Sequence, residues 1–473
     1  MYNVAVGYDA GGDITTGVEN VLIGGLAGDA LTDADYNVAI GTGALSADTL
    51  GSRSIAIGQG TLGAQNFTSA TNTYNIAIGY GAGDSITTAV QNLFIGGLAG
   101  DDTTTGNYNI AIGHSAMTTN TTGNQNVAIG RNALDTNTTG VNNVAVGNHA
   151  LDANTTAANN TAVGYQTLLV NTTGERNVAV GAIALDANTT GTYGVAIGYS
   201  ALGANTTADG NTAVGFNVLG ANTTGAANVG MGQGALSANT TGASNTAIGK
   251  DALTANTTGT RNTALGRTAL QTNTEGNDNT SGGYFAMYLN TTGGSNTAFG
   301  KDALRANTTG AENTVVGSLA ADALTTGSYN VAIGMQALGA DTLGRKSVAI
   351  GQQALLVQNF TSATDTFNTA VGFDAGAAVT TGTQNTFVGA LAGDGTNDGA
   401  ENTAMGYMAL SANAADSNTA IGRQAGLVCT GSTNTFLGKS AGAAVTSGSN
   451  NLFLGVDAGR TGSPGGNWTT QSN

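Results

Sequence analysis

The sequence contains little of what most soluble globular domains are built from. Charged residues make up 9 % of its 473 residues and aromatic residues 5 %, with one proline and one cysteine, Cys429. Ordinary soluble domains are about 25 % charged, so a conventional globular surface is not expected. A lone cysteine excludes an internal disulfide and a cysteine-based metal cluster. No apolar run approaches the roughly 18 residues of a membrane-spanning helix, so the chain is not expected to be membrane-embedded.

Positive charge is also scarce. The chain has 13 Lys and Arg against 29 Asp and Glu, for a net charge of -16. Nucleic-acid binding requires clustered cations, so no nucleic-acid partner is expected. A hydrophobic fraction of 40 % argues against disorder, and the single proline argues against a collagen-like chain despite 75 glycines.

What the sequence does contain is one phrase repeated along its length. NVAIG at 126–130 returns as NVAVG at 143–147 and as NTAVG at 160–164, each 17 residues further on. The chain holds 27 such copies, and we number each copy from position 1, the Asn of the phrase, to position 17. Position 5 is Gly in every copy, and two copies, 54–74 and 347–367, are 21 residues long. We therefore predict one continuous repeat domain over 1–459, followed by an irregular tail over 460–473.

A repeat of this length predicts the fold. It is too short for a helix hairpin, which needs 30 residues or more, but suits one coil of a parallel β-solenoid. The phrase forms a short strand, the Gly at position 5 forms a corner, and the NTTG at positions 12–15 forms a second turn. The prediction is an all-β, parallel β-solenoid (β-roll) of 27 coils that stack as an elongated rod.

The repeat also predicts which side chains touch. Position 4 is apolar in 26 of the 27 copies and is expected to point into the interior, with position 3 on the opposite face. Position 3 is usually Ala, and the copies with a large residue there have Gly at position 9, where Leu is usual. Positions 3 and 9 are therefore predicted to be in contact. Two apolar faces on one thin coil favour a homotrimer in which three chains share the second face.

The phrases SIAIG (54–58), SVAIG (347–351) and NVAIG resemble the head repeats of YadA-like trimeric autotransporter adhesins. That resemblance implies a trimer of parallel β-rolls that displays a surface for matrix or cell binding. The repeats also look like those of phage tail-fibre shafts. The coil here is longer than in YadA-like heads because of NTTG, and the repeats over 1–459 are not expected to include a coiled-coil stalk or an anchor barrel. Neither family supplies catalytic residues.

A column of asparagines at position 12 is the first candidate site. We predict that these side chains form a stacked amide ladder, as in cross-β stacks. Most of them also begin an Asn-Thr-Thr sequon, which leaves glycosylation as an alternative, and the Thr columns leave a surface-ordering array as another. The column consists of Asn120, Asn137, Asn154, Asn171, Asn188, Asn205, Asn222, Asn239, Asn256, Asn273, Asn290 and Asn307.

Two loops and one aromatic cluster are further candidates. The long copies carry similar inserts, and loops on a rigid scaffold are common binding sites. These candidate contact loops are Asn66, Phe67 and Thr68, and Asn359, Phe360 and Thr361. The candidate aromatic patch, Tyr284, Phe285 and Tyr288, either binds a ligand or refills space left by Gly282 in its copy. A spacer role is the alternative for the inserts.

No residue pattern predicts chemistry, so we predict a non-enzyme with no cofactor, no metal site and no catalytic residues. The leading hypothesis is a structural extracellular or cell-surface fibre that associates with itself, with an adhesive role toward a host-surface or glycan receptor. The alternatives are a phage tail-fibre shaft on a virion and a surface-array binder such as an ice-binding protein. Because no distinct capping coils occur, we also expect end-to-end stacking or a longer parent protein.

Overall fold

The computed structural model describes residues 2–459, and the predicted tail at 460–473 lies outside them. The described residues form short strands and turns and no helix, so no helical segment here is long and apolar enough to cross a bilayer. They divide into two compact units: unit 1 is 2–234 with 238–241, and unit 2 is 242–459 with 235–237. The predicted class is confirmed, because the chain makes about 27 parallel β-solenoid turns about 17 residues apart.

Unit 1 places a three-residue strand at positions 2–4 of each coil. Two further strands of two residues each, β4 and β6, flank the first insert. The strands of unit 1 are β1 (Val4–Val6), β2 (Val21–Ile23), β3 (Val38–Ile40), β4 (Gly51–Ser52), β5 (Ile55–Ile57), β6 (Thr71–Asn72), β7 (Ile76–Ile78), β8 (Leu93–Ile95), β9 (Ile110–Ile112), β10 (Val127–Ile129), β11 (Val144–Val146), β12 (Thr161–Val163), β13 (Val178–Val180), β14 (Val195–Ile197), β15 (Thr212–Val214) and β16 (Val229–Met231).

Unit 2 follows the same plan, with β23 and β25 flanking the second insert. Its strands are β17 (Thr246–Ile248), β18 (Thr263–Leu265), β19 (Thr280–Gly282), β20 (Thr297–Phe299), β21 (Thr314–Val316), β22 (Val331–Ile333), β23 (Gly344–Arg345), β24 (Val348–Ile350), β25 (Thr364–Asp365), β26 (Thr369–Val371), β27 (Thr386–Val388), β28 (Thr403–Met405), β29 (Thr419–Ile421), β30 (Thr435–Leu437) and β31 (Leu452–Leu454).

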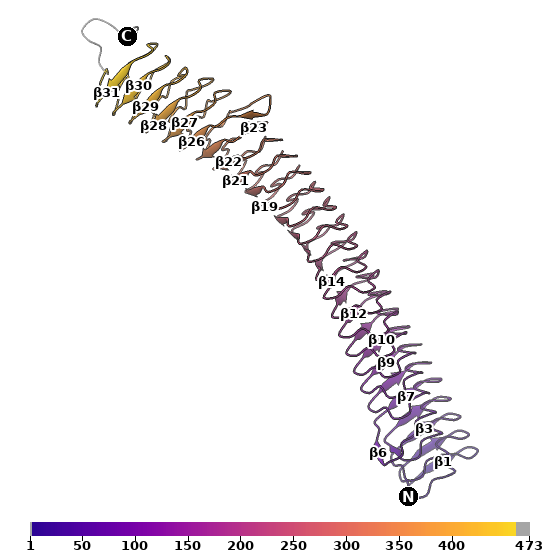
Figure 1. Cartoon of the computed structure of the whole chain (residues 1–473). Coiled ribbons are helices and arrows are strands. Elements are labelled where there is room, and N and C mark those ends of the chain that lie inside the picture. Colours follow the sequence, from indigo (N-terminus) through magenta and orange to yellow (C-terminus); the bar gives the residue numbers. More distant parts are fainter. Residues whose placement is uncertain (1, 460–473) are drawn as a thin grey trace. The chain divides into compact units, whose positions relative to one another are not determined.

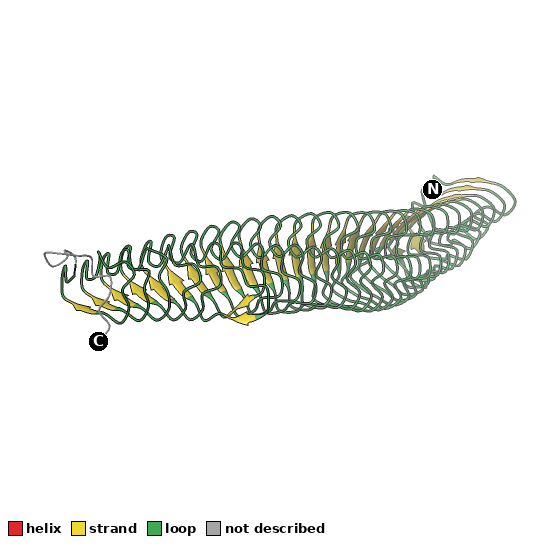
Figure 2. Ribbon diagram, turned by 90° about the horizontal axis from the view of Figure 1, so that it is seen from above, coloured by secondary structure: helices red, strands yellow, loops and turns green. Residues whose placement is uncertain are grey.

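Within each unit, every strand pairs in parallel with the strand of the next coil. Val127 of β10 is opposite Val144 of β11, and Thr263 of β18 is opposite Thr280 of β19. Successive strands therefore follow one another in sequence order (Figure 1). In each unit they line one side of the coil stack, and turns form the rest of each coil (Figure 2).

The glycine at position 5 is required by how closely the coils stack. Gly130 has a φ of 134°, and a Cβ on it would lie 2.6 Å from the carbonyl oxygen of Gly147 in the next coil. A side chain would therefore clash with backbone as well as strain the corner. The predicted corner is thus a point of direct backbone contact between neighbouring coils.

The interior of the coil is formed by position 3, and the expectation for position 4 was wrong. Ala128 in β10 and Ala247 in β17 are completely buried, whereas Ile248 beside Ala247 is 41 % exposed. Positions 2 and 4 both point outward because side chains alternate along a strand, which leaves only position 3 inside. The interior is narrow, so it accepts Ala on the strand and completes its packing with Ala and Leu at positions 8 and 9, such as Ala252 and Leu253.

The predicted contact between positions 3 and 9 is confirmed. A Cβ placed on Gly100 would lie 2.6 Å from the ring of Phe94, and one on Gly393 would lie 2.5 Å from the ring of Phe387. Gly83, in the coil before Phe94, would also meet that ring, at 3.0 Å. Each large residue at position 3 therefore fills the volume that leucines occupy elsewhere, as close packing requires.

Candidate interaction surface

The outward side of the strands carries a column of exposed apolar side chains in each unit. We call the side chains at positions 2 and 4 the outer stripe. Many position 4 side chains in it are about two-fifths exposed, including Ile129 at 37 % and Leu437 at 47 %. None of the described three-residue strands has a charged residue at either position, although the chain carries 42 charged residues. Contiguous apolar surface of this kind marks interaction sites in soluble proteins.

The outer stripe differs between the two units at position 2. In unit 1 this position is Val, Ile or Leu in every coil strand except those that begin at Thr161 and Thr212. In unit 2 it is Thr in every coil strand except those that begin at Val331, Val348 and Leu452. Position 4 is apolar in both units apart from Gly282. Unit 1 therefore has two apolar columns and unit 2 has one apolar and one hydroxylated column.

The position 12 asparagines lie inside the coils as a hydrogen-bonded ladder. Asn137 Nδ2 donates to Asn120 Oδ1 at 2.8 Å, and Asn154 Nδ2 donates to Asn137 Oδ1 at 2.7 Å. The same contact continues through Asn239 in unit 1, and in unit 2 from Asn256 through Asn307. Each buried amide thus forms a hydrogen bond with the next one along the stack. Such bonds keep the free-energy cost of burying polar groups small.

This burial bears on the glycosylation alternative. Asn120, Asn188 and Asn290 are completely buried, and their Nδ2 groups also donate to a carbonyl three residues further on, in the NTTG turn. Attachment of a glycan replaces a hydrogen of that same Nδ2 and adds a bulky group. The ladder sequons are therefore not accessible in the folded coil.

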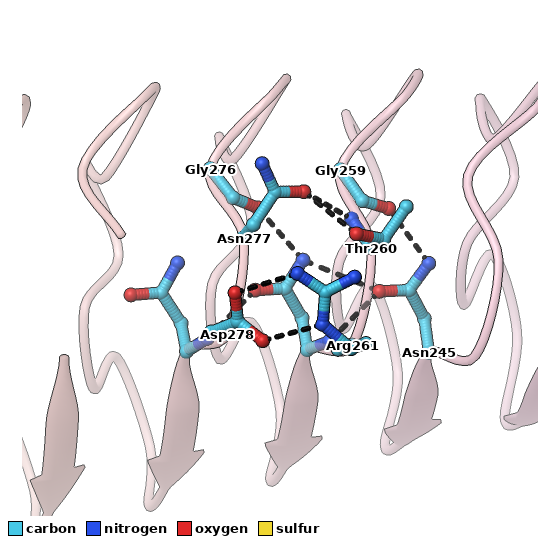
Figure 3. A network of polar contacts seen from close by, with 9 residues as sticks. Asn245, Gly259, Thr260, Arg261, Gly276, Asn277 and Asp278 are labelled. Atoms are coloured by element: carbon cyan, nitrogen blue, oxygen red, sulfur yellow. Dashed lines mark hydrogen bonds and ion pairs between the residues drawn. The ribbon is translucent and has the colours of Figure 1, made fainter. Parts of the chain in front are cut away.

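A second asparagine ladder, at position 1, was not predicted. Asn245 Oδ1 accepts from the backbone N of Asn262 in the next coil at 2.9 Å, and Asn262 Nδ2 donates to Gly276 O at 2.8 Å (Figure 3). The side chain therefore joins two coils and closes the turn that precedes the strand of the next coil. The signal was present in the sequence, since position 1 is Asn in most copies.

The surface beside the position 1 ladder is polar and repeats with the coils. Thr260 donates from its backbone N and Oγ1 to Asn277 Oδ1, and Arg261 forms an ion pair with Asp278 at 2.6 Å (Figure 3). The ion pair lowers the pKa of the Asp278 carboxyl and raises that of the Arg261 guanidinium. These contacts join neighbouring coils on the exterior, where such pairs contribute little to stability.

The insert of unit 1 is held by a buried carboxylate. Asp48, at position 12 of the coil before the insert, accepts from Gly51 N at 3.0 Å, Phe67 N at 3.2 Å and Gln65 Nε2 at 2.6 Å. Gln65 Oε1 in turn accepts from Asn75 Nδ2 at 2.9 Å. Burial raises the pKa of the Asp48 carboxyl, and its hydrogen bonds offset only part of that effect.

Unit 2 contains the same network at its own insert. Asp341 accepts from Gly344 N at 2.9 Å and from Gln358 Nε2 at 2.6 Å, and Asn368 Nδ2 donates to Gln358 Oε1 at 2.9 Å. Burial likewise raises the pKa of Asp341. Both inserts therefore have the same buried hydrogen-bond network, in which an Asp stands at position 12 in place of Asn and holds the longer coil.

The hydrogen-bond network around Asp48 and Asp341 buries part of each candidate contact loop. Phe67 and Phe360 are each 6 % exposed and pack into the coil, so their rings are not presented to a ligand. The neighbouring Asn66, Thr68, Asn359 and Thr361 are exposed. A contact role for these four polar residues stays a prediction.

The candidate aromatic patch is a real cluster. The rings of Tyr284 and Phe285 lie 4.1 Å apart between centroids, and those of Phe285 and Tyr288 lie 4.8 Å apart. Arg267 and Arg305 stack near Tyr284 and Phe285, at 5.7 and 5.8 Å. The space beside Gly282, however, is occupied by Phe299 of the next coil. The alternative that the patch itself refills that space was therefore wrong.

The two histidines form isolated contacts. His149 Nδ1 lies 2.8 Å from Asp152 Oδ2, and His114 Nδ1 lies 3.0 Å from Ser115 Oγ. Across residues 2–459, no three His, Cys, Asp or Glu side chains come together in a way that could hold a metal ion. Burial raises the pKa of the Cys429 thiol, which packs inside its coil.

Comparison with known proteins adds no family to this description. No protein-family model matches the chain, and no curated protein is similar to it. The fold defines the class, a parallel β-solenoid repeat protein.

Proposed function

We propose that the chain is a non-enzymatic structural protein of an extracellular or cell-surface fibre, and that it associates with itself through the outer stripe. The observation that supports this proposal is the absence of charge from positions 2 and 4 of the coils in every described three-residue strand, in a chain of net charge -16. Like charges repel across an interface, so chains this acidic associate best through a surface that carries none. Burial of the stripe would supply the driving force.

A second copy of the chain suits the stripe because both have the same period. The stripe repeats once per coil, and a partner must present apolar groups at that spacing to cover it. Copies arranged about a rotation axis parallel to the coil stack would place each coil against the same coil of its neighbours. The resemblance to YadA-like heads favours three copies, and a homotrimer is the state we propose. The same resemblance supports an adhesive role, with the phage tail-fibre shaft as the alternative.

Particle mass tests this proposal. Light scattering on the full chain should give three times the chain mass of 46.3 kDa. A variant with Ile129→Lys, Val146→Lys and Val163→Lys places charge on the stripe and should give single chains. Its control is Thr122→Lys, Thr139→Lys and Thr156→Lys, which adds the same charge at exposed residues of the turn at positions 12–15 and should keep the trimer. A wild-type chain that stays monomeric, or a control that dissociates equally, would contradict self-association through the stripe.

A further inference from the structure

A shallow, open groove lies beside the insert of unit 2. It has a volume of about 540 Å³ and lies on the coil side formed by positions 10–13, whereas the outer stripe is formed by positions 2 and 4. Its hollow shape follows from small side chains, because Ala377, Ala378 and Gly395 line it. Val357, which directly precedes the insert, supplies an apolar wall.

The polar groups of the groove combine one acceptor with two amide donors. The Asp394 carboxylate lines the groove and accepts from Ser411 Oγ through one of its oxygens. Asn397 Oδ1 accepts from Thr380 Oγ1, and Asn413 Oδ1 accepts from the backbone N of Asn397 at 2.9 Å. Because both amide oxygens are occupied in this way, the amides are oriented and their Nδ2 groups remain as donors.

This arrangement matches neighbouring hydroxyl groups on a sugar ring. A hydroxyl can donate to the carboxylate while its neighbour accepts from an amide N–H, and the apolar wall can contact the ring's C–H face. An anionic ligand would be repelled by the Asp394 carboxylate, whose pKa is raised mainly by burial and also by the charge of Asp374. Volumes of about 300 Å³ and above are typical of ligand sites. We infer that this groove binds a neutral saccharide.

Unit 1 provides a natural comparison for the groove. At the equivalent coil positions after its insert, unit 1 has Asp84 in place of Ala377, Ser85 in place of Ala378 and Asp102 in place of Gly395. Thr104 stands for Asn397, and its Oγ1 donates to the carbonyl of Thr121 at 3.0 Å. Unit 1 therefore has larger, acidic side chains where small ones line the groove of unit 2, and one of the two amide donors is replaced. Saccharide binding is therefore assigned to unit 2.

The inference goes beyond self-association and gives the proposed adhesive role a ligand class. Its test uses the full chain with glucose, galactose, mannose and N-acetylglucosamine and their disaccharides, monitored by saturation-transfer NMR and calorimetry. At least one should bind, and Asp394→Asn should weaken binding about tenfold or more, the range expected for losing a hydrogen bond to a charged group. Asp101→Asn is the equivalent substitution in unit 1 and should leave binding within about twofold.

A second variant tests whether a loss of binding in Asp394→Asn comes from the lost carboxylate or from a change in local structure. Ala378→Leu fills the groove without altering charge, and it is compatible with the coil because Leu289 occupies the same position in another repeat. It should abolish binding. Failure of every neutral saccharide to bind, equal loss in Asp101→Asn, or unchanged binding in Ala378→Leu would each overturn the inference. Particle mass is measured on the same samples, so a chain that forms trimers but binds no saccharide refutes this inference alone.

Discussion

The two units have the same interior and different exteriors. Position 3 is buried Ala in most coils of both, as at Ala128 in unit 1 and Ala298 in unit 2. Position 2, one residue away, is mostly Val or Ile in unit 1 and mostly Thr in unit 2. Both types are β-branched and suit a strand, so the backbone does not distinguish them. The difference shows that the fold depends on the inward side chains. The outward side chains can vary without changing the fold, and they determine which partners the surface can contact.

The largest expected effect tests whether the interiors are equivalent. Phe94→Ala in unit 1 and Phe387→Ala in unit 2 each leave a cavity, because the facing glycines cannot fill it. Each should destabilise its coils by about 3–5 kcal/mol. Solenoid coils open locally, so hydrogen exchange of the flanking coils is the measurement. The control is Phe94→Leu, since Leu22 occupies the same position naturally, and its loss should be smaller. A large effect in only one unit would break the equivalence.

An intermediate effect is expected in the asparagine ladder. Asn171→Ala in unit 1 and Asn290→Ala in unit 2 each leave a buried amide in a neighbouring coil without its partner. The cost should be about 1–3 kcal/mol in either unit, measured as increased hydrogen exchange in the adjacent coils. Thr173→Ala, at an exposed position of the same coil as Asn171, is the control and should change little. Equal exchange in ladder variant and control would mean that the ladder does not hold the coils together.

The sequence predicts the coil but not which way its side chains point. The 17-residue period, the glycine corner and the contact between positions 3 and 9 follow from repetition and volume, and the structure confirms them. The orientation of the strand does not follow, because both of its faces are apolar. Ala247 is buried and Ile248 is exposed, the reverse of the expectation, because the narrow interior has room only for the smaller side chain. Hydrophobicity alone predicts that Ile248 is buried and that Ala247 faces outward.

For the candidate sites too, the sequence predicts features that recur at one position of the repeat but not features that depend on residues of neighbouring coils. The position 12 ladder is predictable because one residue type recurs at one position. The groove beside Val357 is not, since it arises where small residues of successive coils coincide. The burial of Phe67 in a loop is likewise unpredictable from sequence, because it depends on Asp48 from the preceding coil.

The two inserts should respond alike to pH. Burial raises the folded-state pKa of both Asp48 and Asp341 above the ordinary 3.8. A raised folded pKa means that this contribution to stability is fully present below about pH 3.8 and is lost as pH rises through the folded-state value. Carboxyl signals from the two residues should therefore titrate above the ordinary range, as followed by NMR, and Asp278 should titrate below it. An ordinary midpoint for either buried Asp would show that its insert is not held as tightly as in the other unit.

The smallest effect on folding, and the sharpest test of the comparison, comes from exchanging the exteriors. Thr246→Val, Thr263→Val and Thr297→Val give unit 2 the stripe of unit 1, and Val127→Thr, Val144→Thr and Val195→Thr make the reverse change. Because these side chains point outward, each substitution should change the stability of the isolated chain by no more than about 0.5 kcal/mol. Association should change more, since each added methyl would be buried between copies. We expect the Thr→Val variant to dissociate at lower concentration than wild type and the Val→Thr variant at higher concentration, as measured by sedimentation. Identical dissociation of both variants would mean that position 2 lies outside the contact and that position 4 alone forms it.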